Sequence, residues 1–208
     1  MWIFGKPPKI LFFNNHLKNL ILSLKKYQIK KKSLKSDILK IINKNTISIS
    51  FRERLTPELN FDLKLVNLKR ERPQFKNLKY KKILSYLSKM DNTKSDVGLV
   101  FNKKLLETGT SNLLFVKNDK IFTPKKDYYE GVTYKFFKSK INKIFKKEII
   151  VKELNRFDEI LLVGSGKGVT SVKTIKQINW KRKKLKHYKI FLKHYRLAIK
   201  NCKLYNFN

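Results

Sequence analysis

The tripeptide Gly-Val-Thr occurs twice in this chain of 208 residues, at 131–133 and at 168–170. The second copy ends a glycine-rich run, 164–168, which directly follows the apolar residues 159–163. A glycine followed by a β-branched residue and a hydroxyl can present backbone N–H groups and an O–H group to one anion, as helix starts and backbone nests do. Two such turns in one small domain predict a clamp on a single phosphate group, and hence a phosphorylated cofactor rather than a scaffold protein.

The glycine-rich run does not match the loops that bind nucleotides. Lys167 is followed by Gly168, whereas the P-loop pattern places Ser or Thr after its lysine. Too little chain follows the run for the βαβ unit of a dinucleotide-binding fold.

The formal net charge of +35 would fit a nucleic-acid partner, since clustered Lys and Arg neutralise phosphates. Lysine supplies 43 of the 50 basic residues, and it is abundant together with Ile, Asn, Phe and Tyr, whose codons are also rich in A and T. We therefore attribute much of the charge to genomic base composition and expect no nucleic-acid partner. The tail 180–203, in which lysines and aromatic residues are densely interspersed, is the exception.

Metal and membrane classes find no support in the sequence. Cys202 is the single cysteine, which excludes an internal disulfide and a cysteine-rich zinc site. His16, His187 and His194 have no spacing typical of metal ligands. No apolar run is long enough to span a bilayer, and no signal-peptide pattern opens the chain. We expect a cytoplasmic protein without a metal.

Hydrophobic periodicity predicts short strands mixed with single helices, an α+β fold with a largely antiparallel sheet. We expect a small N-terminal α+β lobe over 1–70, shortened at its start, and a larger lobe over 71–208. The predicted helices are 14–27, 33–42, about 77–89 and the segment after Thr133, and the predicted strands are 47–51, 61–65, 97–101, 112–117, 121–123, 159–163 and 171–175.

Five motifs between residues 75 and 172 follow one another in the order of a known family. They resemble motifs of the fold-type IV pyridoxal-phosphate enzymes, or class IV aminotransferases, which include branched-chain and D-amino-acid aminotransferases and aminodeoxychorismate lyase. No single motif is specific, but the five together in this order are. They are Phe75-Lys76-Asn77-Leu78-Lys79-Tyr80, LETGTSNLLF at 106–115, Ile121-Phe122-Thr123-Pro124, Glu130-Gly131-Val132-Thr133, and 158–165 followed by 168–170.

The resemblance implies a two-lobed fold, pyridoxal 5'-phosphate as cofactor, a small-molecule amino substrate and a homodimer. By this resemblance Lys76 is the catalytic lysine, which forms a Schiff base with the cofactor aldehyde and moves protons. Glu107 is the acid that keeps the pyridine nitrogen protonated.

The remaining site residues also come from the resemblance. Thr133 and Thr170, with the backbone of Val132 and Val169, are expected to hold the cofactor phosphate. The expected contacts to the ring and its phenolate oxygen come from Thr110, Ser111 and Tyr80.

One position departs from the family pattern. His16-Leu17-Lys18-Asn19-Leu20 resembles the family's His-Leu-x-Arg-Leu, so the arginine that normally binds phosphate is Asn19 here. An amide cannot replace a charged, often bidentate guanidinium. We expect weaker cofactor binding unless a lysine such as Lys18 or Lys167 compensates.

Three functions remain open. The first is the lyase that forms 4-aminobenzoate and pyruvate from aminodeoxychorismate in folate synthesis. The second is a branched-chain or D-amino-acid aminotransferase. The third is a degenerate, non-catalytic relative that binds RNA or an acidic partner through its basic tail, where lysines alternate with aromatic residues.

Overall fold

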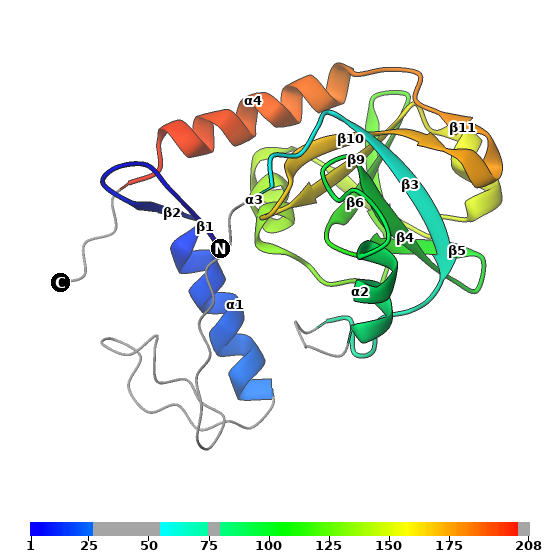
Figure 1. Cartoon of the computed structure of the whole chain (residues 1–208). Coiled ribbons are helices and arrows are strands. Elements are labelled where there is room, and N and C mark those ends of the chain that lie inside the picture. Colours follow the sequence, from blue (N-terminus) through cyan, green and yellow to red (C-terminus); the bar gives the residue numbers. More distant parts are fainter. Residues whose placement is uncertain (27–54, 75–79, 204–208) are drawn as a thin grey trace.

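The computed structural model of the chain describes residues 1–26, 55–74 and 80–203 (Figure 1). The predicted helix 33–42, the predicted strand 47–51 and Lys76 lie outside the described residues. What is described has mixed helix and strand content around one large curled sheet, as expected for the fold class.

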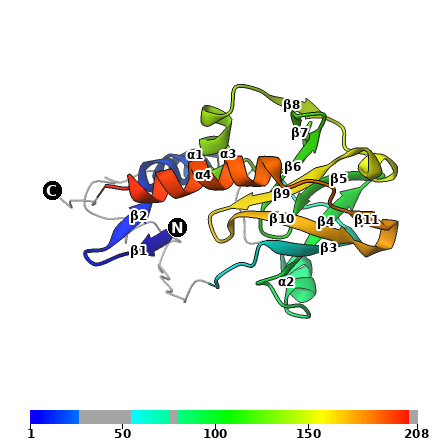
Figure 2. The same ribbon diagram turned by 90° about the horizontal axis from the view of Figure 1, so that it is seen from above.

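A nine-stranded sheet forms the centre of the molecule, in the order β5-β4-β3-β10-β9-β6-β7-β8, with β11 paired to β10 (Figure 2). Strand β3 runs parallel to β4 and β10, and β7 runs parallel to β8, whereas the other neighbours are antiparallel. The strands are β3 (Asn60–Asn67), β4 (Ser95–Phe101), β5 (Lys104–Thr108), β6 (Asn112–Lys117), β7 (Lys120–Pro124), β8 (Ile144–Lys147), β9 (Glu159–Gly164), β10 (Gly168–Ile175) and β11 (Trp180–Lys181).

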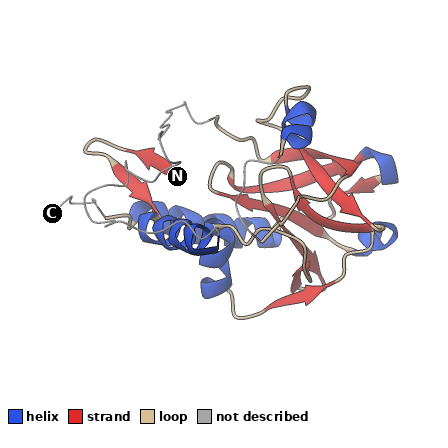
Figure 3. Ribbon diagram, turned by 90° about the horizontal axis from the view of Figure 1, so that it is seen from below, coloured by secondary structure: helices blue, strands red, loops and turns tan. Residues whose placement is uncertain are grey.

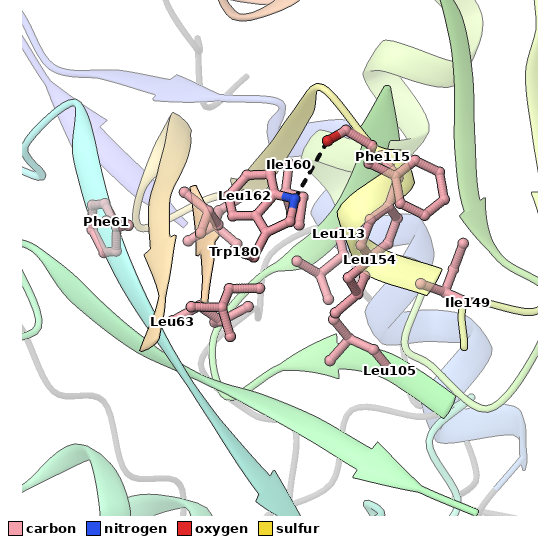
Figure 4. Packing of buried hydrophobic residues seen from close by; sticks show 13 residues of the cluster. Phe61, Leu63, Leu105, Leu113, Phe115, Ile149, Leu154, Ile160, Leu162 and Trp180 are labelled. Atoms are coloured by element: carbon pink, nitrogen blue, oxygen red, sulfur yellow. Dashed lines mark hydrogen bonds between the residues drawn. The ribbon is translucent and has the colours of Figure 1, made fainter. Parts of the chain in front are cut away.

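The apolar core lies on both faces of this sheet because its central strands are apolar without interruption. In β9, Ile160 and Leu162 belong to one buried cluster, and Leu161 and Val163 belong to the other. The first cluster fills the inside of the curl, where the buried indole of Trp180 donates a hydrogen bond of 3.3 Å to the carbonyl of residue 157 (Figure 4). Because β9 and β10 are buried on both faces of the sheet, their positions are fixed by packing. The position of the turn between them is therefore fixed as well.

The second cluster is covered by helices gathered along one flank of the sheet (Figure 3). Helix α3 contacts α1, α4 and β9, and α4 packs along β9 and β10. The helices are α1 (Phe13–Lys26), α2 (Lys81–Leu87), α3 (Val132–Lys140) and α4 (Lys186–Lys200), and the short 3-10 helices are Val151–Arg156 and Lys176–Ile178. A hairpin of β1 (Trp2–Phe4) and β2 (Lys9–Leu11) precedes α1.

The structure differs from the sequence prediction at several elements. Strands β5 and β8 and the β1-β2 hairpin were not predicted, because each is short. Strand β3 lies between β4 and β10, so residues 60–67 share a sheet with the later strands. The division of the chain at residue 70 stays a prediction.

Candidate functional site

Two hydroxyl groups meet where helix α3 begins. Oγ1 of Thr133 lies 3.4 Å from Oγ of Ser165, which in turn lies 3.4 Å from Nε2 of His16. The N–H of Lys135 donates to the carbonyl of Gly131, so the N–H groups of the three residues between them have no acceptor within the helix. A helix N-terminus with two converging hydroxyls favours an anion.

The turn between β9 and β10 brings Ser165 to this position. Gly168 has a φ of +67°, and a Cβ there would lie 2.6 Å from the ring of Tyr195 on α4. Glycine is therefore required at 168 by both backbone conformation and space. The resulting tight turn directs Ser165 toward the start of α3.

A buried acid marks a second part of the site. Glu107 is 3% exposed, and its Oε1 accepts a hydrogen bond of 3.0 Å from Nε of Arg70, while its Oε2 accepts one of 3.3 Å from the N–H of Tyr129. Burial raises the pKa of Glu107, although the Arg70 guanidinium opposes the shift. The guanidinium lies 5.9 Å from the ring centre of Tyr80.

The segment 129–133 connects the acid with the hydroxyl pair. Its first N–H is bonded to Glu107, and its last residue is Thr133. Asn112 holds the segment, because its Nδ2 donates to the carbonyl of Tyr129 at 2.5 Å and its Oδ1 accepts from the N–H of Gly131 at 3.1 Å. The acid and the anion-binding groups are thus held at opposite ends of one short, anchored segment.

A buried ion pair lies beside the glycine-rich turn, at the edge of the site. Nζ of Lys167 lies 2.5 Å from Oδ2 of Asp96 and 2.9 Å from Oγ1 of Thr110, and 4.6 Å from the ring centre of Phe61. Burial lowers the pKa of Lys167, and Asp96 opposes this shift. The pair ties the β9-β10 turn to β4, and the contact with Thr110 ties the turn to the loop between β5 and β6.

The structure brings most of the predicted site residues to this end of the sheet. Val132 and Thr133 begin α3, Thr110 and Ser111 lie in the loop after Glu107, and a Cβ at Gly164 would lie 3.0 Å from Oγ of Ser111. Tyr80 precedes α2 and adjoins Arg70.

Thr170, the second predicted phosphate ligand, lies within a strand, whereas Thr133 lies at the start of a helix. Thr170 is buried within β10, opposite Leu162, and among the described residues its Oγ1 has no hydrogen-bond partner. Val169 lies opposite Val163 in the same ladder. The hydroxyl beside Thr133 is that of Ser165, and the roles of Thr170 and Val169 stay predictions.

Sequence reasoning missed Ser165, Arg70 and Asn112 as site residues. Ser165 follows a glycine directly after an apolar strand, which is a signal that could have found it. Arg70 gave no local signal, because its pairing with Glu107 depends on the tertiary structure.

Neither a metal centre nor a membrane-crossing helix is present in the described part of the chain. No group of three or more His, Cys, Asp or Glu side chains is placed there to hold a metal ion. None of its helices combines the length and hydrophobicity that a bilayer crossing requires.

Comparison with known proteins identifies the family. The model of amino-transferase class IV matches residues 45–175, which is more than half of the chain, and the chain therefore belongs to this family of pyridoxal-phosphate-dependent aminotransferases and lyases. Among proteins with curated functions, none matches the sequence.

Solved structures agree in fold. A candidate 4-amino-4-deoxychorismate lyase from Legionella pneumophila is 14% identical, with a TM-score of 0.70 over 92% of this chain and 86% of that chain. The branched-chain aminotransferase of Thermoproteus uzoniensis is 18% identical, with a TM-score of 0.60 over 73% of this chain and 55% of its own length. The PLP-bound form of a hypothetical aminotransferase from Mycobacterium tuberculosis is 18% identical, with a TM-score of 0.54 over 67% of this chain and 55% of that chain. The chain thus spans little more than half the length of the two aminotransferases.

The donor set fits the cofactor of the family. The hydroxyls of Thr133 and Ser165 at the start of α3 suit a phosphate group. The buried carboxyl of Glu107 suits a protonated ring nitrogen. Among the described residues, the buried hydroxyl of Thr170 has no hydrogen-bond partner.

Proposed function

We propose that the chain is a pyridoxal-phosphate enzyme acting on a small amino substrate, and that its reaction is the release of pyruvate from aminodeoxychorismate to leave 4-aminobenzoate for folate synthesis. The observation that carries the cofactor assignment is the anchored segment 129–133, with the buried Glu107 at one end and the hydroxyls of Thr133 and Ser165 at the other.

The residues divide the work by their chemistry. Bound pyridoxal phosphate supplies an electron sink for the bond broken beside the substrate nitrogen. Glu107 would hold a proton at the ring nitrogen, and the hydrogen bond from Arg70 opposes the rise in the pKa of this carboxyl that burial causes. The start of α3 and the two hydroxyls bind the phosphate. Lys76 is assigned the covalent and proton-transfer role by its motif, since it lies outside the described residues.

The lyase reaction is preferred to transamination because of the extent of the structural likeness. The Legionella protein matches over most of both chains, whereas the Thermoproteus aminotransferase has a large part without a counterpart here. A branched-chain or D-amino-acid aminotransferase is the second candidate, because the family contains both reactions. We also propose that the protein is a homodimer, as the resemblance to the family implies, and that it acts in the cytoplasm.

An RNA-binding role has less support. Stacking on bases requires exposed aromatic faces. In α4, Phe191 is fully buried and His187 and Tyr195 are nearly so, because this stripe packs on the outer face of the sheet. The exposed face of α4 carries lysines and Arg196 together with Ile190 and Leu197. Tyr188 and His194 are half-buried.

The test begins with the visible absorption spectrum of the purified protein mixed with pyridoxal phosphate, compared with Lys76→Ala. We expect a band in the wild type that is absent in the variant, and borohydride reduction followed by peptide mapping should place the modified amine at residue 76. Lys82→Ala, at an exposed position of α2, is the matched control and should retain the band. A wild type without a band would refute the cofactor assignment.

Product analysis then separates the two reactions. Formation of 4-aminobenzoate and pyruvate from aminodeoxychorismate supports the lyase. Amino-acid-dependent exchange with a keto acid, without 4-aminobenzoate, would replace it by the transaminase.

A further inference from the structure

Asn19 stands where the resemblance places the family's phosphate-binding arginine, and a cation reaches Asn19 from another helix. Nζ of Lys135, in the first turns of α3, lies 2.7 Å from Oδ1 of Asn19 on α1. The amide nitrogen of Asn19 donates a hydrogen bond of 3.1 Å to the hydroxyl of Tyr129. The asparagine therefore uses its oxygen to hold an ammonium group and its nitrogen to hold a residue of the anchored segment.

This ammonium group lies between α1 and α3, the two helices that also carry His16 and Thr133. His16 and Asn19 are three residues apart on α1 and hence share a face, and His16 contacts Ser165. Thr133 and Lys135 both belong to the start of α3. The contacts from His16 through Ser165 to Thr133, and from Asn19 to Lys135, both join α1 to α3.

The other lysines considered from the sequence are less suited. Lys167 is bound to Asp96 and Thr110, so its charge is already compensated. Lys18 is exposed and is turned away from the face that carries His16 and Asn19 by the helical rotation between neighbouring residues.

The pair Asn19 and Lys135 also explains why the arginine can be absent. An arginine at 19 would place a second cation against Lys135, and like charges at this distance repel. An amide oxygen instead accepts a charge-assisted hydrogen bond from the ammonium group. One positive charge is thus kept at this position, but it is supplied by α3 instead of α1.

We propose that Lys135 is the cation of the phosphate subsite and that Asn19 is its positioning residue. This inference rests on the proposed function, since it assigns the partner of the cofactor phosphate. Lys135 is partly exposed, and its removal would leave the hydroxyls and the start of α3 to bind the phosphate alone.

The experiment measures equilibrium binding of pyridoxal phosphate, and of pyridoxal, which lacks the phosphate, to the wild type and to Lys135→Met. Loss of a charge-assisted hydrogen bond predicts a Kd for pyridoxal phosphate raised by about 10- to 100-fold. The Kd for pyridoxal should stay unchanged. Lys138→Met, at an exposed position of the same helix, is the matched control and should bind both compounds as the wild type does.

Two further variants test the charge itself. Lys135→Arg should bind pyridoxal phosphate nearly as tightly as the wild type, and Asn19→Arg combined with Lys135→Met should recover most of the lost affinity. Thermal unfolding of each variant verifies that it is folded.

The outcomes distinguish this inference from the proposed function. Equal binding of pyridoxal phosphate by Lys135→Met and the wild type would overturn the role of Lys135 and leave the proposed function standing. An equal loss for pyridoxal and pyridoxal phosphate would also overturn it, because the effect would not concern the phosphate. A wild type that binds neither compound would overturn the proposed function and this inference with it.

Discussion

The buried ion pair between Asp96 and Lys167 provides the sharpest test of how the site is held. The side chain of Asp96 is fully buried and that of Lys167 is 9% exposed. Removing one partner of a buried pair costs about 3–5 kcal/mol, since the other charge stays buried without compensation. Asp96→Asn keeps an oxygen that can accept from Lys167, so we expect a loss near the lower end, about 3 kcal/mol of the free energy of unfolding.

The loss should depend on pH in a defined direction. Burial lowers the pKa of Lys167 from its ordinary value of 10.5, and Asp96 opposes this shift, so Asp96→Asn lowers the pKa further. Between the folded-state pKa and 10.5 the folded protein binds fewer protons than the unfolded chain, and stability rises with pH. In the variant this window extends to lower pH, so the deficit in its free energy of unfolding shrinks as the pH rises from the folded-state pKa of Lys167 in the variant to that in the wild type.

Urea unfolding at several pH values measures the effect, in a cycle with Lys167→Met and the double variant. The double variant should lose less than the sum of the single ones, because it leaves no buried charge unpaired. Asp91→Asn, which removes an exposed carboxylate, is the control and should change the free energy of unfolding far less. A loss for Asp96→Asn below about 1 kcal/mol, or one independent of pH, would refute the reasoning.

Three further predictions concern the elements around the site. Gly168→Ala should lower the free energy of unfolding, measured with urea, by at least about 1–2 kcal/mol, because the φ of residue 168 is +67°. Gly166→Ala is the control and should lower it much less, because a Cβ at 166 would meet no atom within 4 Å. Arg70→Met should raise the pKa of Glu107 further. In urea unfolding, the loss in free energy of unfolding should be small below pH 4.5, where Glu107 is protonated in both the folded and the unfolded state, and should grow to about 3 kcal/mol at neutral pH. A loss that does not change with pH would contradict this. Phe191→Ala should lower the free energy of unfolding by about 3–5 kcal/mol in thermal or urea unfolding, since the ring of Phe191 is fully buried. An unchanged unfolding midpoint would show that the packing of α4 does not depend on this ring.

The long periodic elements could be predicted from sequence. The predicted strand 112–117 has the observed bounds, and the predicted strand 159–163 is one residue shorter than β9. The amphipathic helix predicted from Tyr134 to Lys146 corresponds to α3, but α3 ends at Lys140 and residues 144–147 form β8 instead. These elements have apolar runs or faces that burial on the sheet satisfies directly. Strand β5, which contains Glu107, was missed because five residues ending in polar positions give no clear period.

Sequence motifs alone indicated the family and selected Glu107 and Thr133 as candidate site residues, because residue type and order along the chain suffice for this. The parallel pairing of β3, the contact of Ser165 with Thr133, and the pairing of Arg70 with Glu107 came only from the tertiary structure. The same is true of the cation at Asn19, since Lys135 is more than a hundred residues away along the chain. Such contacts join residues remote in sequence, and only the packing of α1, α3 and the curled sheet decides which side chains meet.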